Sequence, residues 1–214
     1  MYRLILFDFD FTLVDSSKGI IKSIKYALRK NQYCIPSDSN IRNTIGLPLK
    51  DAFFTLCDTT DEKKYNLFKH FFMESSREVM CKNTAVFDDT IFTLQQLKKR
   101  GLKIAIVSAK DKKTIQKIAE QYDFLKYIDM IVGEHEVINL KPHPDQVQMV
   151  LDVLGIAATD TLYIGDNLID GLTAERASVD FLALTTGTTT EHQFKEITTI
   201  GIVSRLKELL VYIE

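Results

Sequence analysis

Five short apolar runs rich in Ile, Val, Leu and Phe punctuate the chain. Each run is continuous rather than alternating, which is typical of strands that are covered on both faces. The runs are YRLILFDFD, LKIAIVSA, DMIVG, TLYIGD and DFLALTT. Between them lie helical patterns, in DDTIFTLQQLKKRG, KKTIQKIAEQY, PDQVQMVLDVLG and IDGLTAERAS. Strands that alternate with helices predict a doubly wound, Rossmann-like α/β fold, with a five-stranded parallel sheet and helices on both faces.

One segment breaks this alternation. From about Asp15 to Ala85 the periodicity is helical and no convincing strand occurs. The longest helices are expected in SKGIIKSIKYALRK and DEKKYNLFKHFFMESSREVM, with SNIRNTIGLPLKDAFF between them. A helical insertion directly after the first strand predicts a cap domain at residues 15–85. Residues 1–14 and 86–214 then form the α/β core domain.

Composition and charge narrow the class of protein. The chain has 214 residues, of which 45% are hydrophobic and 26% are charged, so it can bury a sizeable core. A formal net charge of −2 gives no sign of the basic surface that binding to nucleic acid or to an anionic membrane requires. Three cysteines without a C-x-x-C pair argue against a disulfide framework and fit a reducing compartment. No signal peptide and no long apolar run is visible, which predicts a soluble, cytoplasmic protein.

The first apolar run carries two carboxylates, in FDFDFTL. Asp8 and Asp10 are two residues apart, so along a strand they point to the same face. Two like charges about 4 Å apart repel by roughly 4 kcal/mol at an effective dielectric near 20. A cation or a catalytic use is therefore expected at this position.

Other runs are followed by polar residues as well. These residues are Asp8 and Asp10 after the first run, Ser108 after the second, Lys141 after the third, and Asp166 with Asp170 after the fourth. In open parallel sheets, ligands bind beyond the carboxyl ends of the strands, so one crevice would collect these groups. Carboxylates suit a hard divalent cation such as Mg²⁺, and an aspartate can also serve as the nucleophile in phosphoryl transfer. A hydroxyl and an ammonium can hold the phosphoryl oxygens.

The same residues stand in motifs that resemble those of the haloacid dehalogenase superfamily of aspartate-nucleophile phosphatases. FDFDFTL at 7–13 is similar to its D-x-D-x-T signature, and Ser108 matches its second motif. KPHP at 141–144 matches K-P-x-P, and GDNLID at 165–170 matches G-D-x-x-x-D. The motifs occur in the family's order, and the insertion lies where its helical-cap branch carries one. IGLPL at 45–49 is similar to a segment common in the phosphoglycolate-phosphatase-like group.

The resemblance implies a role for each of these residues. Asp8 would be the nucleophile and Asp10 the general acid and base. The side chains of Asp8 and Asp166 and the backbone carbonyl of Asp10 would bind Mg²⁺, supported by Asp170. Ser108 and Lys141 would bind the phosphate.

Two departures from the family pattern, and a set of neighbouring residues, bear on substrate choice. Phe11 stands where many members have Gly, and Ala109 follows Ser108 where many relatives have Asn. Gly46 lies in the IGLPL segment, which would face the site. Arg42 and Lys50 flank that segment and could reach a substrate carboxylate or a second phosphate. His143, beside Lys141, could also touch the substrate.

The expected activity is that of a Mg²⁺-dependent phosphatase acting on a small phosphomonoester. Phosphoglycolate, pyrophosphate, a sugar phosphate and a nucleoside monophosphate all stay open as substrates. A phosphomutase of the β-phosphoglucomutase kind shares the motifs and is the alternative. A dehalogenase is less favoured, because Asp10 would have no evident role there. A phosphonatase would need a Schiff-base lysine from the cap, and a silent binding module would be expected to lack a motif residue; none is missing.

Overall fold

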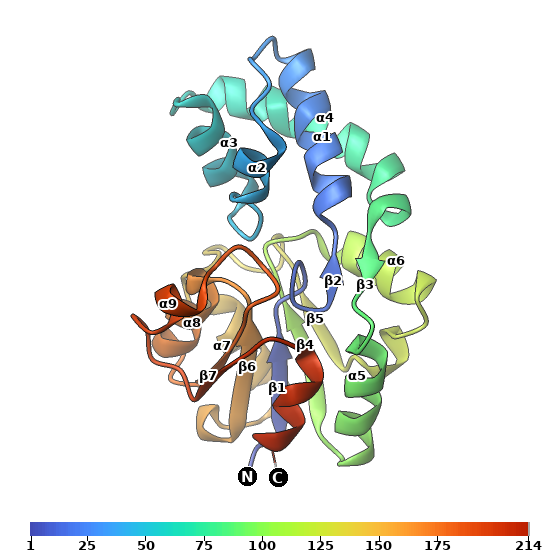
Figure 1. Cartoon of the computed structure of the whole chain (residues 1–214), viewed down its shortest axis with the longest axis vertical. Coiled ribbons are helices and arrows are strands. Elements are labelled where there is room, and N and C mark those ends of the chain that lie inside the picture. Colours follow the sequence, from blue (N-terminus) through green and yellow to red (C-terminus); the bar gives the residue numbers. More distant parts are fainter. Residues whose placement is uncertain (214) are drawn as a thin grey trace.

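The computed structural model describes residues 1–213. An α/β core lies at one end of the molecule and a set of helices lies at the other (Figure 1). The N-terminus lies at the far end of the core from these helices (Figure 1). Within the described residues, the helices are all too short or too polar to cross a membrane.

A parallel sheet forms the centre of the core. Its strands are β1 (Leu4–Phe7), β4 (Lys103–Val107), β5 (Met130–Val132), β6 (Thr161–Gly165), β7 (Asp180–Leu184) and β8 (Gly201–Val203). They lie in the order β5-β4-β1-β6-β7-β8, and neighbouring strands are parallel. The predicted doubly wound α/β fold is confirmed. The described sheet has six strands rather than five, because β8 spans only three residues and gives no apolar run in the sequence.

β1 lies in the middle of the sheet because all four of its residues are apolar and fully buried. Ile5 and Phe7 point to one face, and Leu4 and Leu6 point to the other. Phe7, the last residue of the strand, pairs with both neighbouring strands, opposite Ile106 and Ile164. The chain that leaves β1 therefore enters the crevice between two strand ends.

Helices cover both faces of the sheet. Those on the face of Ile5 and Phe7 are α5 (Thr90–Lys99), α6 (Lys112–Gln121) and the 3₁₀ helix Leu206–Val211. Those on the opposite face are α7 (Asp145–Leu154), α8 (Leu168–Arg176) and α9 (Glu191–Phe194). Further 3₁₀ turns span Cys81–Asn83, Leu125–Tyr127 and Ala158–Asp160.

A helical insertion lies between β1 and α5. Its helices are α1 (Ser17–Lys30), α2 (Asp38–Arg42), α3 (Leu49–Cys57) and α4 (Glu62–Val79). The α4 helix starts at Asp61, whose carboxylate accepts the amides of Lys63 and Lys64. Phe53 of α3 stacks on Phe68 of α4, with ring centroids 4.6 Å apart. The helices of the insertion thus pack on one another through apolar side chains, which are continuous with the core on one face of the sheet.

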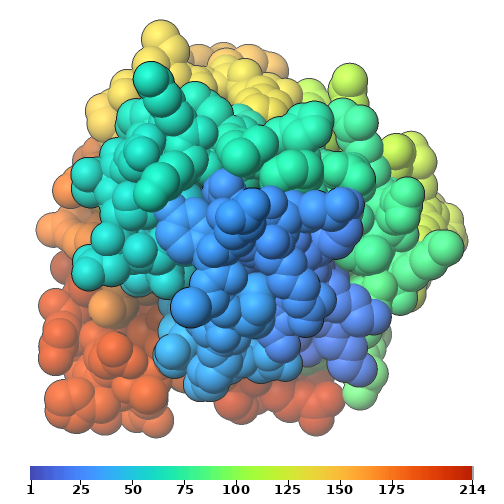
Figure 2. All heavy atoms as spheres, turned by 90° about the horizontal axis from the view of Figure 1, so that it is seen from above, coloured from blue at the N-terminus to red at the C-terminus, as the bar shows by residue number. Residues whose placement is uncertain are grey.

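The two chain crossings between insertion and core lie side by side. β2 (Val14–Asp15) pairs with β3 (Ala85–Val86) in an antiparallel two-residue ladder. Seen from above, the insertion covers the middle of the core's upper end, and core residues are visible around it (Figure 2). The helical insertion therefore covers the end of the sheet at which β1 delivers Asp8.

Candidate active site

Four segments bring polar side chains to the carboxyl end of the sheet. Asp8 directly follows β1, Ser108 directly follows β4, and Asp166 directly follows β6. Lys141 comes from the loop between β5 and α7, and Asp170 from the first turn of α8. All five residues are buried. The crevice that the sequence predicts is thus present, and it gathers residues up to 162 positions apart in the chain.

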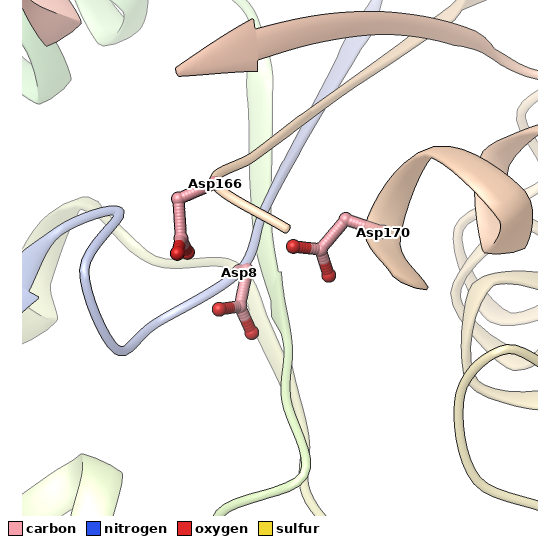
Figure 3. Close-up of side chains that lie close together, drawn as sticks. All are labelled: Asp8, Asp166 and Asp170. Atoms are coloured by element: carbon pink, nitrogen blue, oxygen red, sulfur yellow. The ribbon is translucent and has the colours of Figure 1, made fainter. Parts of the chain in front are cut away.

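Three carboxylates converge in this crevice (Figure 3). Asp8, Asp166 and Asp170 each offer an oxygen, and these oxygens lie within 4.8 Å of one another. The Lys141 ammonium lies between two of them, 2.7 Å from Asp8 Oδ1 and 2.7 Å from Asp170 Oδ1. Only two of the three N–H groups of that ammonium are used in these contacts.

Two glycines make the close packing of these carboxylates possible. A Cβ at Gly165 would lie 2.5 Å from the Asp170 carboxylate, and a Cβ at Gly187 would lie 1.9 Å from Asp166 Oδ2. Only a residue without a side chain fits at either position. The first glycine of the GDNLID motif is therefore required by the position of the motif's second aspartate.

Further hydrogen bonds hold the carboxylates in place. Asp170 accepts the amide of Asn167 at 3.1 Å, which completes a capping box at the start of α8. It also accepts the hydroxyl of Tyr163 at 3.0 Å. Thr12 donates its hydroxyl to Asp166 Oδ1 at 3.1 Å. The threonine of the FDFDFTL segment thus orients a carboxylate from another strand.

The charges of this cluster do not balance. Three carboxylates and one ammonium leave a formal excess of two negative charges in a buried crevice. Burial raises the pKa of Asp8 to about 7, and the nearby carboxylates of Asp170 and Asp10 raise it too, although Lys141 lowers it. Burial, Asp8 and Asp170 together hold the pKa of Asp166 well above its usual value. Burial lowers the pKa of Lys141, but the two adjacent carboxylates outweigh it and keep the ammonium charged.

These residues fit a divalent cation. The donor set consists of carboxylate oxygens, the ligands that hard cations such as Mg²⁺ prefer. A double positive charge would also neutralise the excess charge of Asp8, Asp166, Asp170 and Lys141. The side chain of Asp10 does not belong to this set. A contribution from its backbone carbonyl stays a prediction.

Asp10 has partners of its own. Its carboxylate accepts the hydroxyl of Ser16 and forms an ion pair with Lys110, whose Nζ lies 3.0 Å from Oδ2. Both members of this ion pair are buried. The sequence prediction missed Lys110, although its position two residues after Ser108 places it on the same strand end.

Gln146 of α7 binds the backbone at Ser108 and at the end of the neighbouring strand β5. The side-chain amide of Gln146 donates to the carbonyl oxygens of Ser108 and Gly133, both at 2.8 Å. Ser108 itself is buried at the end of β4 and borders the same pocket as Asp8. The structure therefore brings the predicted phosphate-binding hydroxyl to the carboxylate cluster.

A pocket opens from this cluster toward the helical insertion. It encloses about 760 Å³, part of it open to solvent. The core contributes Asp8, Asp10, Ser108, Ala109, Lys110, Asp111, Thr114 and Glu134. The insertion contributes Ile20, Ile24, Thr44, Ile45, Gly46, Leu47, Leu49, Ala52, Phe72, Met73, Ser76 and Met80. The sequence prediction missed most of the insertion's wall, because its residues come from three helices and a loop.

Of the five residues expected to select the substrate, only Gly46 borders this pocket. The Arg42 guanidinium lies over the buried ring of Phe11, 4.4 Å from its centroid. Lys50 pairs with Glu62 at 2.5 Å on the surface of the insertion. His143 pairs with Asp145 at 2.7 Å and is half exposed. The structure does not bring these four side chains to the pocket.

Known proteins resemble this chain over most of its length. The haloacid dehalogenase-like hydrolase family matches residues 5–184. The chain belongs to this family. Its four sequence motifs are the four segments that meet in the carboxylate cluster. The family assignment predicted from the motifs is thereby confirmed.

Individual proteins show the same likeness. A haloacid dehalogenase-like hydrolase from Bacteroides fragilis has a solved structure that superposes with a TM-score of 0.95 at 34% identity, covering 98% of this chain and 100% of that one. Probable phosphatase IndB of Dickeya dadantii (strain 3937) is 29% identical over 213 residues, covering 98% of this chain and 93% of the relative. Phosphoglycolate phosphatase of Shigella boydii serotype 4 (strain Sb227) is 26% identical over 211 residues, covering 86% and 82%.

Proposed function

We propose that the protein is a Mg²⁺-dependent phosphatase that hydrolyses a small phosphomonoester through a phosphorylated aspartate. One observation carries this proposal: Asp8 is buried beside Lys141 and borders a pocket that also contains Asp10. A nucleophile, a proton donor and a cation are thus available to one substrate. Relatives named phosphatase and phosphoglycolate phosphatase support a phosphatase activity.

In the first step, an oxygen of Asp8 attacks the phosphorus and the bond to the leaving oxygen breaks. Protonated Asp10 gives its proton to that oxygen, so that the substrate leaves as an alcohol. Lys110 and Ser16 hold the Asp10 side chain during this transfer. The Ser108 hydroxyl and the third N–H of Lys141 bind phosphoryl oxygens and stabilise the charge that develops on them.

In the second step, ionised Asp10 takes a proton from water as the water attacks the phosphorus. Asp8 is released as a carboxylate and inorganic phosphate leaves. Mg²⁺ held by Asp8, Asp166 and the carbonyl of Asp10, with Asp170 in support, would neutralise the negative charge of the phosphoryl group. The same ion would offset the excess charge of the aspartate cluster.

We also propose that residues 15–85 act as a cap domain on a core of residues 1–14 and 86–214. The chain passes between the two parts at the paired strands β2 and β3, so small changes there would move the insertion over the pocket. Because insertion residues border the pocket, opening would admit the substrate and closure would exclude water.

The test is phosphate release from a panel of phosphomonoesters in the presence of Mg²⁺. Asp8→Asn should reduce turnover by at least about a thousandfold while the protein stays folded, because a carboxamide is a poor nucleophile. Asp123→Asn changes an exposed carboxylate and serves as the control, with wild-type activity expected. Turnover of Asp8→Asn within about tenfold of wild type would contradict the proposal. Formation of an isomerised sugar phosphate instead of free phosphate would favour a phosphomutase.

A further inference from the structure

The pocket wall opposite Asp8 and Asp10 is apolar. The insertion supplies nine apolar side chains to it: Ile20, Ile24, Ile45, Leu47, Leu49, Ala52, Phe72, Met73 and Met80. They come from α1, α3, α4, the residue that follows α4 and the loop between α2 and α3, so apolar side chains from each of these segments line the wall. This is the part of the pocket that faces the leaving group when a phosphoryl group lies against Asp8.

The hydroxyl groups in this wall are already engaged. Thr44 donates to the carbonyl oxygen of Ile41 at 2.8 Å, and Ser76 donates to that of Met73 at 3.2 Å. Both donors thus serve the backbone of the insertion itself. On the core side, Thr114 donates to Asp111 at 3.0 Å. A polyhydroxylated leaving group would find few free hydrogen-bond donors here.

The charges that border the pocket also disfavour an anionic leaving group. Lys110 is the only Lys or Arg among the described residues in its lining, and this lysine is committed to Asp10. Asp111 and Glu134 add carboxylates to the core side of the pocket. Burial raises the pKa of Glu134, although the nearby His135, Lys69 and Lys110 lower it. Arg42 and Lys50, which flank the IGLPL segment, are held by Phe11 and Glu62 outside the pocket.

We propose that the substrate is the phosphomonoester of an uncharged, largely apolar alcohol, whose carbon chain or ring packs against the apolar wall of the insertion. This inference rests on the proposed phosphatase function and names its substrate class. It disfavours phosphoglycolate and pyrophosphate, because the carboxylate of the one and the second phosphate of the other would enter a pocket without a free cation.

A matched pair of substrates tests this directly. n-Butyl phosphate and 3-phosphooxypropanoate both extend four heavy atoms beyond the ester oxygen, and only the second ends in a carboxylate. We expect kcat/KM for n-butyl phosphate to be higher by at least about tenfold. Along the series from ethyl to butyl phosphate, kcat/KM should rise by up to about fourfold per methylene, which corresponds to ~0.8 kcal/mol of buried apolar surface.

Variants of the wall provide the second arm of the test. Leu47 borders the pocket and is only half buried, so Leu47→Ala should leave the fold intact. It should lower kcat/KM for n-butyl phosphate about three- to tenfold and lower kcat/KM for 3-phosphooxypropanoate by a smaller factor. Leu47→Arg should raise kcat/KM for 3-phosphooxypropanoate, since it supplies the missing cation. Leu67→Ala, an exposed position on α4, is the matched control and should change neither substrate.

The outcomes separate this inference from the proposed function. If the enzyme prefers 3-phosphooxypropanoate, phosphoglycolate or pyrophosphate, the substrate class is wrong while the phosphatase function stands. Equal effects of Leu47→Ala on both esters would also overturn the substrate class. If no phosphate is released from any ester or from pyrophosphate, the proposed function fails, and this inference fails with it.

Discussion

Replacing Lys141 by Met should destabilise the metal-free protein by about 3–5 kcal/mol at pH 8. Methionine keeps the length and the apolar stem of the side chain but removes the ammonium. Its two contacts, each of 2.7 Å, are worth roughly 6 kcal/mol apiece at an effective dielectric of 20. The cost of burying Lys141 offsets much of that attraction. The net loss then approaches the cost of breaking a buried ion pair by removing one partner, about 3–5 kcal/mol.

The pH dependence of this loss has a definite sign. Asp8 already has a pKa of about 7 in the folded protein against 3.8 for the free group. Without the ammonium the folded-state pKa rises further, so folding favours the protonated acid and the penalty grows as the pH rises. The loss of stability should therefore be smaller at pH 5 than at pH 8. Mg²⁺ should stabilise the variant more than the wild type, because it supplies the positive charge that the variant lacks.

Urea unfolding followed by circular dichroism, in excess chelator and then in Mg²⁺, measures these differences. Lys98→Met is the matched control. Its ammonium also lies 2.7 Å from a carboxylate, that of Asp129, but it is about one-third exposed and Lys103 bonds the same carboxylate. The control should lose less than about 1 kcal/mol. A loss from Lys141→Met that is no greater than that of the control would refute the electrostatic account of the site.

Three further results are expected. Lys110→Met should lower kcat by about ten- to a hundredfold, because Asp10 loses a buried charged partner worth roughly 1.5–3 kcal/mol. In chelator, the unfolding free energy of the wild type should fall by roughly 3.5 kcal/mol between pH 4 and 7 through Asp8 alone, since the group stays protonated in the folded chain up to a pKa of about 7. Phe11→Gly should lower the free energy of unfolding in urea by roughly 2 kcal/mol. Losing the buried ring beneath Arg42 costs about 3–5 kcal/mol. Relieving the left-handed backbone of Phe11, at φ 62°, returns only ~1–2 kcal/mol.

A specific outcome would contradict each of these three predictions. Lys113→Met, an exposed change in the same segment, controls for Lys110→Met, and equal kcat values for the two would remove any role for the ion pair. The pH dependence should be much weaker in Asp8→Asn; a slope as steep as in the wild type would mean that another group titrates. A gain in stability for Phe11→Gly would show that backbone strain, not packing against Arg42, decides that position.

Much of the core could be predicted from the sequence because most of its strands are continuous apolar runs, and several of them are followed directly by a polar residue. The LILF run of β1 followed by Asp8 shows both features in one segment. β8 was not predicted, because Gly201–Val203 is too short to show a hydrophobic periodicity. The cluster of Asp8, Asp166 and Asp170 was predictable because the carboxyl ends of parallel strands share one edge.

The residues that shape the pocket could not be predicted in the same way. Arg42 and Lys50 flank the IGLPL segment in sequence, yet each is held by a partner, Phe11 or Glu62, that only the folded chain reveals. The apolar wall combines side chains that helical periodicity assigns to the interior of the insertion, and sequence alone does not tell a packed interior from a pocket lining. The ion pair of Lys110 with Asp10 depends on the mutual approach of two strand ends.

The most direct test of the central claim is to look for the phosphoryl group on Asp8 itself. Asp10→Asn should slow the second step, because no carboxylate remains to activate water, so the phosphorylated enzyme should accumulate. The variant is mixed with acetyl phosphate and Mg²⁺, quenched in acid, digested and analysed by mass spectrometry. We expect one added phosphoryl group on the peptide that contains Asp8, and none in the double variant that combines Asp8→Asn with Asp10→Asn. Turnover without that adduct, or an adduct on another residue, would contradict it.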